Sequence, residues 1–236
     1  YYLSGVSMED LSVVIPCYRE NHKFIDKSVS ELEKLGVEVI VVDDGSEKPY
    51  SKAIKHGVNQ GYGSALLTGI KSATRPLICT MDGDGQHTVG DVVNLYIAWR
   101  MMKNVDMLIG SRRLKSERWY RMFGRKVLNW IASLVTGQYF QDLNSGMRMF
   151  RRSVALGYAP ILCRNFSFTT SLTISMLCDG YRIESFPINV EARKYGGSKV
   201  RLLTDGIVTL WYILFLGLVF RTRRIRSFLR KLRGEK

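Results

Sequence analysis

The sequence predicts an α/β protein built on a doubly wound, mostly parallel β-sheet. Its strand-like segments are short runs of Val, Ile and Leu with few polar residues, as expected of strands that are buried on both faces of a sheet. These runs alternate with longer segments in which apolar residues recur at helical spacing. Strand–helix–strand repetition of this kind is typical of doubly wound sheets. With 236 residues and 46% hydrophobic composition, the chain is long enough to bury one substantial core.

The first half of the chain follows this alternation in order. Residues 11–17 (LSVVIPC) predict the first strand, and apolar residues at near-helical spacing over 21–35 predict the first helix, with Gly36 as its C-cap. The β-branched run 37–42 predicts the second strand. The elements expected after it are a helical stretch from about Pro49, a loop over Gly57–Gly63, a helix over 64–73, a strand over 77–81, a helix over about 89–102 and a strand over 106–109.

Beyond Gly110 the sequence becomes basic and aromatic. In residues 111–136, Arg and Lys are interleaved with Trp, Tyr, Phe and aliphatic residues. A basic amphipathic helix of this kind can cover a core, lie on a membrane interface or bind nucleic acid. The sequence pattern alone does not distinguish these three roles. A further helix is expected over 166–178, and one or two strands over 181–190.

An apolar run near the C-terminal end predicts a helix with affinity for lipid. Residues 207–220 (IVTLWYILFLGLVF) carry no charge, and several arginines follow from Arg221. At 1.5 Å per residue this run spans about 21 Å, less than the roughly 30 Å of bilayer hydrocarbon. We therefore expect a helix in the headgroup region, with its basic tail on anionic lipid. A helix buried against the domain and a full span are the alternatives.

These changes of composition divide the chain into three parts. Residues 1–10 are expected to be a flexible N-terminal segment or a remnant ahead of the first patterned segment. Residues 11–200 form the main domain, which includes the basic amphipathic segment 111–136. Residues 201–236 form a membrane-associated apolar helix and basic tail.

The formal net charge of +14 is unevenly distributed. Residues 112–126 and 221–236 are dense in Arg and Lys, whereas the acidic strand-end residues lie in the first half. This asymmetry indicates a polyanionic partner, namely nucleic acid, anionic lipid or a phosphorylated substrate. The four cysteines are scattered, without the spacing of a metal site, which favours reduced core residues in a cytoplasmic protein.

The most informative motif is Asp82-Gly-Asp84-Gly-Gln86-His87, directly after the apolar run 76–81. Open α/β sheets bind their ligands at the carboxyl ends of the strands. Two carboxylates separated only by a glycine can turn toward one point, and hard oxygen ligands suit Mg²⁺ or Mn²⁺ that is shared with substrate phosphates. The structural alternative is a polar turn that follows a strand.

Two other strand ends carry acidic residues, in Pro16-Cys-Tyr18-Arg-Glu20 and in Asp43-Asp44-Gly45-Ser46. The full series of motifs, in chain order, is VVIPCYRE, VVDDGS, NQGYGSALLTGI, MDGDGQH, IGSR, DLNSGMRMF and RKYGGSK. This series resembles the inverting glycosyltransferases of family 2, which have the GT-A fold. Within that family it is similar to the dolichyl-phosphate mannose synthases and other polyprenyl-phosphate glycosyltransferases. The resemblance covers about residues 11–199.

The resemblance implies a role for each motif. Asp82, Asp84 and Gln86 would bind the Mg²⁺ or Mn²⁺ that bridges the diphosphate of a nucleotide sugar. The residues implied in binding that donor are Pro16, Tyr18, Glu20, Asp43, Asp44, Asp82 and Lys199. The residues implied in catalysis are Asp84, Asp142 and Arg193, and Arg193 would close over the diphosphate together with Lys199. The residues implied in seating an acceptor phosphate are Arg112, Arg121 and Arg125.

The acceptor decides whether a general base is needed. A sugar hydroxyl must lose a proton, whereas a phosphate monoester already carries most of its second negative charge at pH 7. A polyprenyl phosphate is therefore its own nucleophile. Asp142 is then expected to position the sugar or the acceptor loop, with Arg148 balancing its charge. The sequence departs from the family pattern at Arg19, where Asn is usual.

The leading hypothesis is a metal-dependent enzyme that moves a hexose, with inversion, from a donor of the GDP-mannose or UDP-glucose type to a dolichyl or undecaprenyl phosphate. It would act at the cytoplasmic face of a membrane rich in anionic lipid, and a homo-oligomer is compatible with the sequence. The alternative is transfer to a saccharide or protein hydroxyl, with Asp142 as the base. A nucleic-acid-binding module is disfavoured, because acidic loops at three strand ends would repel phosphates unless a metal intervenes.

Overall fold

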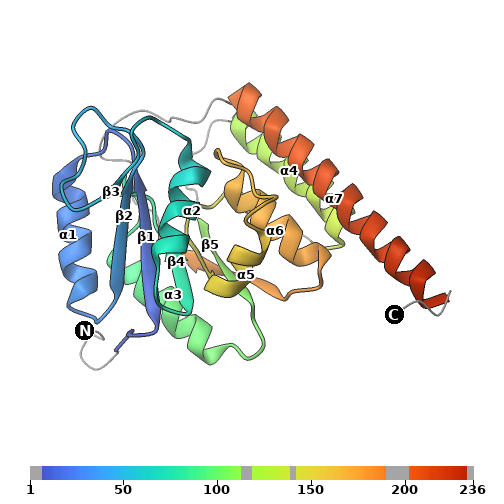
Figure 1. Cartoon of the computed structure of the whole chain (residues 1–236), viewed down its shortest axis with the longest axis horizontal. Helices are drawn as coiled ribbons and strands as arrows, with labels where there is room; N and C mark the ends of the chain where they lie inside the picture. Colours follow the sequence, from blue (N-terminus) through green and yellow to red (C-terminus); the bar gives the residue numbers. More distant parts are fainter. Residues whose placement is uncertain (1–6, 113–118, 139–141, 190–201, 233–236) are drawn as a thin grey trace.

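The structure, a computed structural model, describes residues 7–112, 119–138, 142–189 and 202–232, with side chains except at 119–121, 202–203 and 223–232 (Figure 1). Within these residues the strands form one seven-stranded sheet in the order β3-β2-β1-β4-β6-β5-β7. β6 runs antiparallel to β4 and β5, and the other neighbouring pairs are parallel. The predicted α/β fold with a mostly parallel sheet is confirmed.

The strands and helices have the following bounds. The strands are β1 (Leu11–Cys17), β2 (Glu38–Asp43), β3 (Ile54–Lys55), β4 (Leu77–Thr80), β5 (Met107–Arg112), β6 (Arg148–Arg151) and β7 (Ile183–Ile188). The helices are α1 (His22–Glu33), α2 (Tyr62–Ser72), α3 (Val89–Met101), α4 (Trp119–Thr136), α5 (Arg152–Tyr158), α6 (Phe168–Cys178) and α7 (Leu202–Leu232).

β1 illustrates why the central strands are apolar throughout. All of its residues are buried. Val13 and Ile15 belong to the core cluster on one face of the sheet, and Val14 belongs to the cluster on the other face, since successive side chains of a strand point to opposite faces. Helices α1 and α3 cover the first face, whereas α2, α5 and α6 cover the second (Figure 1).

Helix α7 adds an outer layer to the second face. It packs against α6 and α4, and α4 and α7 lie side by side on the outside of α6 (Figure 1). Ile213, Leu216 and Phe220 of α7 are buried in the core cluster of this face. By length and composition, the stretch Thr204–Thr222 would suffice to cross a membrane, yet 22% of it is buried within the protein.

Helix α7 ends well beyond the apolar run. The helix continues through the arginine-rich segment to Leu232, because Arg, Lys and Leu are strong helix formers. The predicted apolar C-terminal helix is confirmed, and it includes much of the basic segment that follows the apolar run. One face of α7 is packed on the domain, as in one of the two alternatives to the headgroup prediction.

Four elements of the first 160 residues differ from the prediction, namely the helix expected from Pro49 and the unpredicted elements β3, β6 and α5. No helix begins at Pro49, because the carboxylate of Asp43 accepts hydrogen bonds from the backbone N–H groups of Ser46 and Tyr50, which hold this segment in turns before β3. The short strand β6 and the helix α5 after it were not predicted. At the N-terminal side, Met8 is fully buried in the core, so the packed domain includes residues ahead of β1.

Candidate active site

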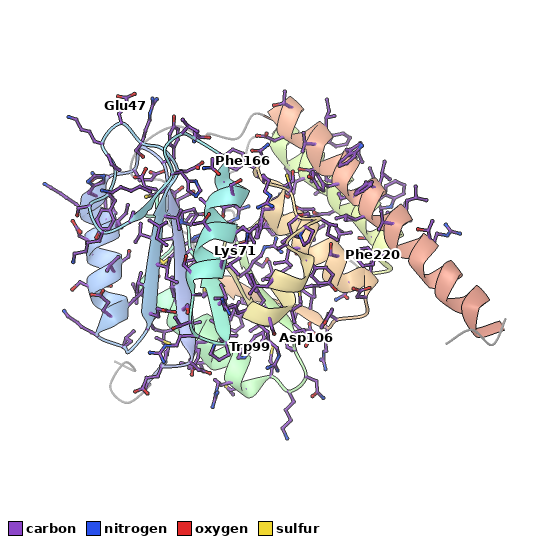
Figure 2. The ribbon with its side chains drawn as sticks, viewed as in Figure 1. Glu47, Lys71, Trp99, Asp106, Phe166 and Phe220 are labelled. Carbon is purple, nitrogen blue, oxygen red and sulfur yellow. The ribbon has the colours of Figure 1, made fainter. Side chains whose placement is uncertain are left out.

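The carboxyl ends of β1, β2, β4 and β5 lie along one edge of the sheet, the upper edge in Figure 1. Figure 2 places Glu47 and Phe166 at this edge, and Trp99 and Asp106 at the opposite end. The three acidic motifs predicted to share a site follow β1, β2 and β4. Because ligands of open α/β sheets bind beyond the carboxyl ends of the strands, this edge is the candidate active site.

Asp82, just beyond β4, is held by groups from three segments of the chain. The hydroxyl of Tyr62, at the start of α2, donates a hydrogen bond of 2.8 Å to Asp82 Oδ1. The backbone N–H of Asp82 donates to His87 Nδ1 (3.2 Å), which places the proton of a neutral His87 ring on Nε2. Gly146 lies against the carboxylate so closely that a Cβ there would overlap both of its oxygens. The side chain of Asp82 keeps 29% exposure.

Tyr62 remains a hydrogen-bond donor at neutral pH. Burial and the neighbouring charge of Asp82 raise its pKa well above 10. Its ring stacks on Phe166, with the centroids 5.6 Å apart and the planes 15° from parallel. Sequence analysis assigned no role to Tyr62, although it lies in the quoted NQGYGS motif.

The turn after Asp82 presents the second carboxylate of the pair. The backbone N–H of Gln86 donates to Asp84 Oδ1 (3.1 Å), and Gly85 adopts φ +76°, a conformation that favours glycine. Helix α3 then begins with a capping box between Thr88 and Asp91. This cap fixes where the turn ends, so Asp82 and Asp84 stay on one short loop.

The donor set of this loop fits a hard divalent cation that is shared with phosphate. Within the described residues, no three His, Cys, Asp or Glu side chains form a cluster that could hold a metal alone. Asp82, Asp84 and the amide of Gln86 would supply part of an octahedral shell, and water and a diphosphate would complete it, as Mg²⁺ usually requires. The predicted Mg²⁺ or Mn²⁺ is therefore chemically compatible with these residues.

Asp43 and Asp44, predicted to bind the nucleotide, are both buried and shape the loops around them. Burial alone would raise the pKa of Asp43, but hydrogen bonds from the backbone of Ser46 and Tyr50 lower it below its usual value. Asp44 accepts hydrogen bonds from the N–H groups of Gln60 (2.9 Å) and Gly61 (2.8 Å). Their contact with a nucleotide stays a prediction.

His56 completes the bracing of Asp44. Its Nδ1 donates to Asp44 Oδ1 over 2.7 Å, and its Nε2 lies 3.0 Å from Thr68 Oγ1 of α2. Both side chains of the His56–Asp44 pair are at least nine-tenths buried. This histidine ties the loop after β2 to α2, a contact that no local sequence signal indicates.

The predicted base-binding segment after β1 combines buried and accessible residues. Pro16 is buried within β1, whereas Tyr18 and Glu20 are partly exposed. Between them Arg19 adopts φ +53°, a conformation that Asn tolerates better than Arg. Contacts of Arg19 hold the turn: its N–H donates to Ser46 Oγ (2.8 Å), and its guanidinium lies 2.6 Å from Glu47 Oε1.

Arg112 and Asp142 form a two-pronged ion pair at the end of β5. Nε of Arg112 donates to Asp142 Oδ2 (2.7 Å) and Nη2 donates to Asp142 Oδ1 (3.1 Å). The side chain of Asp142 is 1% exposed and that of Arg112 is 24% exposed. Both oxygens of this carboxylate are therefore occupied by the same guanidinium.

Arg148 does not hydrogen-bond to Asp142 but fixes the loop that carries it. It is fully buried at the start of β6, and its guanidinium donates to the backbone carbonyls of Leu143 and Ser145 and to the hydroxyl of Thr173. Burial lowers the pKa of Arg148 to about 10, an effect that the negative charge of Asp142 opposes. The direct hydrogen-bonding partner of Asp142 is thus Arg112.

The remaining predicted site residues are less fully described. Arg193 and Lys199 lie outside the described residues, as does the side chain of Arg121. Arg125 is partly buried on α4. Its part in binding an acceptor stays a prediction.

Comparison with known proteins identifies the family of the chain. The model for glycosyl transferase family 2 matches residues 12–157, which contain the strand ends described above. A protein of Methanocaldococcus jannaschii, MJ1222, is 29% identical over 231 residues, which cover 90% of this chain and 93% of that protein. The undecaprenyl-phosphate 4-deoxy-4-formamido-L-arabinose transferase of Proteus mirabilis is 26% identical, over 92% of this chain and 70% of the transferase.

Solved structures agree with this assignment at the level of the fold. A crystal structure of glucosyl-3-phosphoglycerate synthase from Mycobacterium tuberculosis with phosphoglyceric acid has a TM-score of 0.70 at 17% identity, covering 90% of this chain and 84% of that one. A complex of the same enzyme with Mn²⁺, UDP-glucose and phosphoglyceric acid also has a TM-score of 0.70, covering 92% and 84%. The chain belongs to glycosyl transferase family 2 and has the GT-A fold.

Proposed function

We propose that this protein transfers a hexose from a nucleotide diphosphate sugar, of the GDP-mannose or UDP-glucose type, to a polyprenyl phosphate. An oxygen of the acceptor phosphate forms a bond to the anomeric carbon as the bond to the donor diphosphate breaks. The nucleoside diphosphate leaves with the electron pair, and the anomeric configuration inverts. The similarity to an undecaprenyl-phosphate sugar transferase supports this acceptor class.

The ion pair of Asp142 carries the proposal. A hydroxyl acceptor needs a general base within hydrogen-bond reach. Asp142, which would be that base in the hydroxyl-acceptor alternative, is buried, and both of its oxygens accept hydrogen bonds from Arg112. A phosphate acceptor needs no base, because its oxygens already carry negative charge at pH 7. The paired state of Asp142 thus favours a phosphate acceptor.

The donor would lie along the strand ends. Tyr18 and Glu20, with Asp43 or Asp44, would contact the base and ribose, and Pro16 would shape the turn that presents them. Asp82, Asp84 and Gln86 would hold Mg²⁺ or Mn²⁺, which neutralises the charge that develops on the leaving diphosphate. Arg193 and Lys199 would close over the same diphosphate. Solved neighbours of this fold have been crystallised with UDP and with Mn²⁺ or Mg²⁺.

The acceptor would approach from the side of α4 and α7. Large apolar side chains are exposed on both helices, and we call this set the apolar face: Met122, Phe123, Val127, Trp130 and Leu134 on α4, with Ile207, Trp211, Leu214, Phe215 and Leu218 on α7. Exposed apolar patches of this kind mark interaction sites. A lipid surface fits best, because the apolar face is followed by an arginine-rich segment that attracts anionic lipid.

Placed on the cytoplasmic face of a membrane, the apolar face would bring the site close to the phosphate of a membrane-embedded polyprenol. Arg112, Arg121 and Arg125 would bind that phosphate. Arg112 stands at the end of β5, the edge of the sheet that also carries the metal loop.

A transfer assay with a panel of acceptors tests the proposal. The purified protein, Mn²⁺ and labelled GDP-mannose or UDP-glucose are incubated with a polyprenyl phosphate, the free polyprenol, a soluble saccharide or 3-phosphoglycerate, and the products are identified by mass spectrometry. We expect a glycosylated lipid phosphate from the polyprenyl phosphate alone. Transfer to the polyprenol or the saccharide would establish the hydroxyl-acceptor alternative. Transfer to 3-phosphoglycerate alone would overturn the lipid acceptor.

Asp142→Asn separates the two acceptor classes in a second way. If Asp142 is not a catalytic base, the substitution should lower the rate only modestly and should leave the shape of the pH–rate profile unchanged. Loss of a true base would instead lower kcat by about a hundredfold to ten-thousandfold and remove one ionisation from the profile.

A further inference from the structure

We propose that Tyr62 is a positioning residue of the metal site, whose hydroxyl holds the carboxylate of Asp82 in the orientation that binds the cation. This role depends on the proposed function, since it requires a metal at Asp82 and Asp84. The hydrogen bond from Tyr62 to Asp82 Oδ1 measures 2.8 Å, and the two residues belong to different elements, α2 and the loop after β4. Because the hydroxyl of Tyr62 donates to the carboxylate of Asp82, Tyr62 would act on the cation through that carboxylate.

The position of Tyr62 is itself fixed by the segment between α5 and α6. The ring of Tyr62 stacks on Phe166 of that segment. The two glycines that flank Tyr62 allow this close approach: a Cβ on Gly61 would overlap Asn165, and a Cβ on Gly63 would overlap the backbone of Cys163. The N–H of Ser64 also donates to the carbonyl of Arg164 over 2.9 Å. These contacts leave the start of α2 little freedom to move.

The same segment is attached to α7. Ser167 Oγ lies 2.7 Å from Thr209 Oγ1, and both side chains are buried. A continuous series of contacts therefore runs from α7 through Ser167 and Phe166 to Tyr62, and from Tyr62 to Asp82. The orientation of the Asp82 carboxylate depends on how α6 and α7 are packed as well as on its own loop.

Asp82 needs this support because its own loop does not fix its side chain. Glycine follows Asp82 and again follows Asp84, and glycine restricts the backbone least of all residues. Gly146 limits the carboxylate on one side, and the hydroxyl of Tyr62 holds one oxygen. Groups that orient metal ligands in this way typically account for a 10- to 100-fold difference in metal affinity.

Tyr62→Phe tests the proposal, because it removes the hydroxyl and keeps the ring that stacks on Phe166. Binding of Mn²⁺ to the full chain is measured by electron paramagnetic resonance in the presence of UDP or GDP, without any turnover. We expect the Kd for Mn²⁺ to rise about tenfold or more. In transfer assays the loss of rate should be largest at low Mn²⁺ concentration and should diminish as Mn²⁺ is raised.

Tyr96→Phe is the matched control. Tyr96 also donates to an aspartate, Asp10, over 2.7 Å, but at the opposite end of the sheet from the candidate site. Its loss should leave Mn²⁺ binding unchanged. Phe166→Leu, which removes the stacking partner of Tyr62, should raise the Kd for Mn²⁺ in the same direction as Tyr62→Phe, and it provides the test if Tyr62→Phe does not fold.

The outcomes separate this proposal from the proposed function. If the wild-type protein binds Mn²⁺ with a nucleotide and Tyr62→Phe binds it equally well, the role of Tyr62 is overturned while the metal site stands. If the wild-type protein binds no Mn²⁺ with either nucleotide, both the metal site and the role of Tyr62 are overturned. A rise in Kd in Tyr96→Phe as large as in Tyr62→Phe would assign the effect to general destabilisation and would also refute the role.

Discussion

The position of the Asp82 carboxylate depends on the absence of a side chain at Gly146 as well as on hydrogen bonds. Gly146 belongs to the loop before β6, and its α-carbon lies directly against the Asp82 carboxylate. The loop is kept there by Thr80, whose hydroxyl donates to the carbonyl of Gly146 over 2.6 Å, and by the buried Arg148. A residue 64 positions further along the chain than Asp82 therefore limits where that carboxylate can lie.

Gly146→Ala should displace the carboxylate of Asp82. The added methyl group overlaps both carboxylate oxygens, so the carboxylate must move away from the position in which Tyr62 donates to it. We expect the affinity for Mn²⁺ in the presence of a nucleotide to fall at least about tenfold, as measured by Mn²⁺ titration. Gly157→Ala is the control, because nothing lies within 4 Å of a Cβ at that position. Equal Mn²⁺ affinity in both variants would contradict this account of Asp82.

The sequence predicted which residues gather at the site better than it predicted their partners. Asp43, Asp82 and Asp84 end or follow clear strand patterns, so their position at one edge follows from the parallel pairing of β1 with β2 and β4, whereas Arg112 reaches this edge because β5 and β4 are both antiparallel to β6. The pairing of Arg112 with Asp142 could not be predicted in this way, because the two residues are 30 positions apart. Any basic residue near Asp142, including Arg148, could balance its negative charge. Only the packing of the loop before β6 selects between them.

The helices and strands that could not be predicted from the sequence have no clear periodic pattern of apolar residues. β6 consists of Arg-Met-Phe-Arg and is stabilised by neighbours on both sides, so its local sequence carries little strand signal. The segment after Pro49 contains helix-forming residues, but the carboxylate of Asp43 accepts hydrogen bonds from the N–H of Tyr50 in this segment and from the N–H of Ser46 just before it. The long apolar strands and helices were predicted correctly because burial on one or both faces imposes the pattern on the sequence itself.

Helix α7 offers a matched pair of leucines for testing its two faces. Leu216 is 0% exposed in the core, whereas Leu218, two residues further on, is 63% exposed on the apolar face. Leu216→Ala should lower the free energy of unfolding by about 2–5 kcal/mol, through lost burial and the cavity left behind. Leu218→Ala should change it by less than about 0.5 kcal/mol. Urea denaturation of both variants measures the difference, and equal costs would show that α7 does not pack as described.

At the scale of the whole molecule, charge and apolar surface lie in the same region. The net charge is +14, and arginines continue α7 directly beyond its apolar stretch. Deleting α7 would not isolate the proposed affinity for lipid, since Ile213, Leu216 and Phe220 belong to the core. Substitutions on the exposed side of the helix pair avoid this difficulty.

Replacing Trp130 and Leu218 together by Ser should weaken binding to vesicles that contain anionic lipid by about a hundredfold, since burial of each side chain in lipid contributes on the order of 1.5 kcal/mol. Sedimentation with vesicles measures the effect, and Met101→Ser, at an exposed residue on α3, is the control. Raising the salt concentration from roughly 0.1 M to roughly 1 M should also weaken binding, because the Debye length falls from about 10 Å to about 3 Å. Unchanged binding of the double variant would exclude the apolar face as the membrane contact.

Helix α7 follows α6, which it covers, in chain order, and this order has a consequence for biosynthesis. Domains begin to fold from the N-terminal side while the ribosome is still elongating the chain. Until β6 emerges, β4 has an open edge on one side, and until α7 emerges, part of the core over α6 faces water. The nascent protein therefore covers this part of its core only when the helix that presents Trp211 and Leu218 outward has been synthesised.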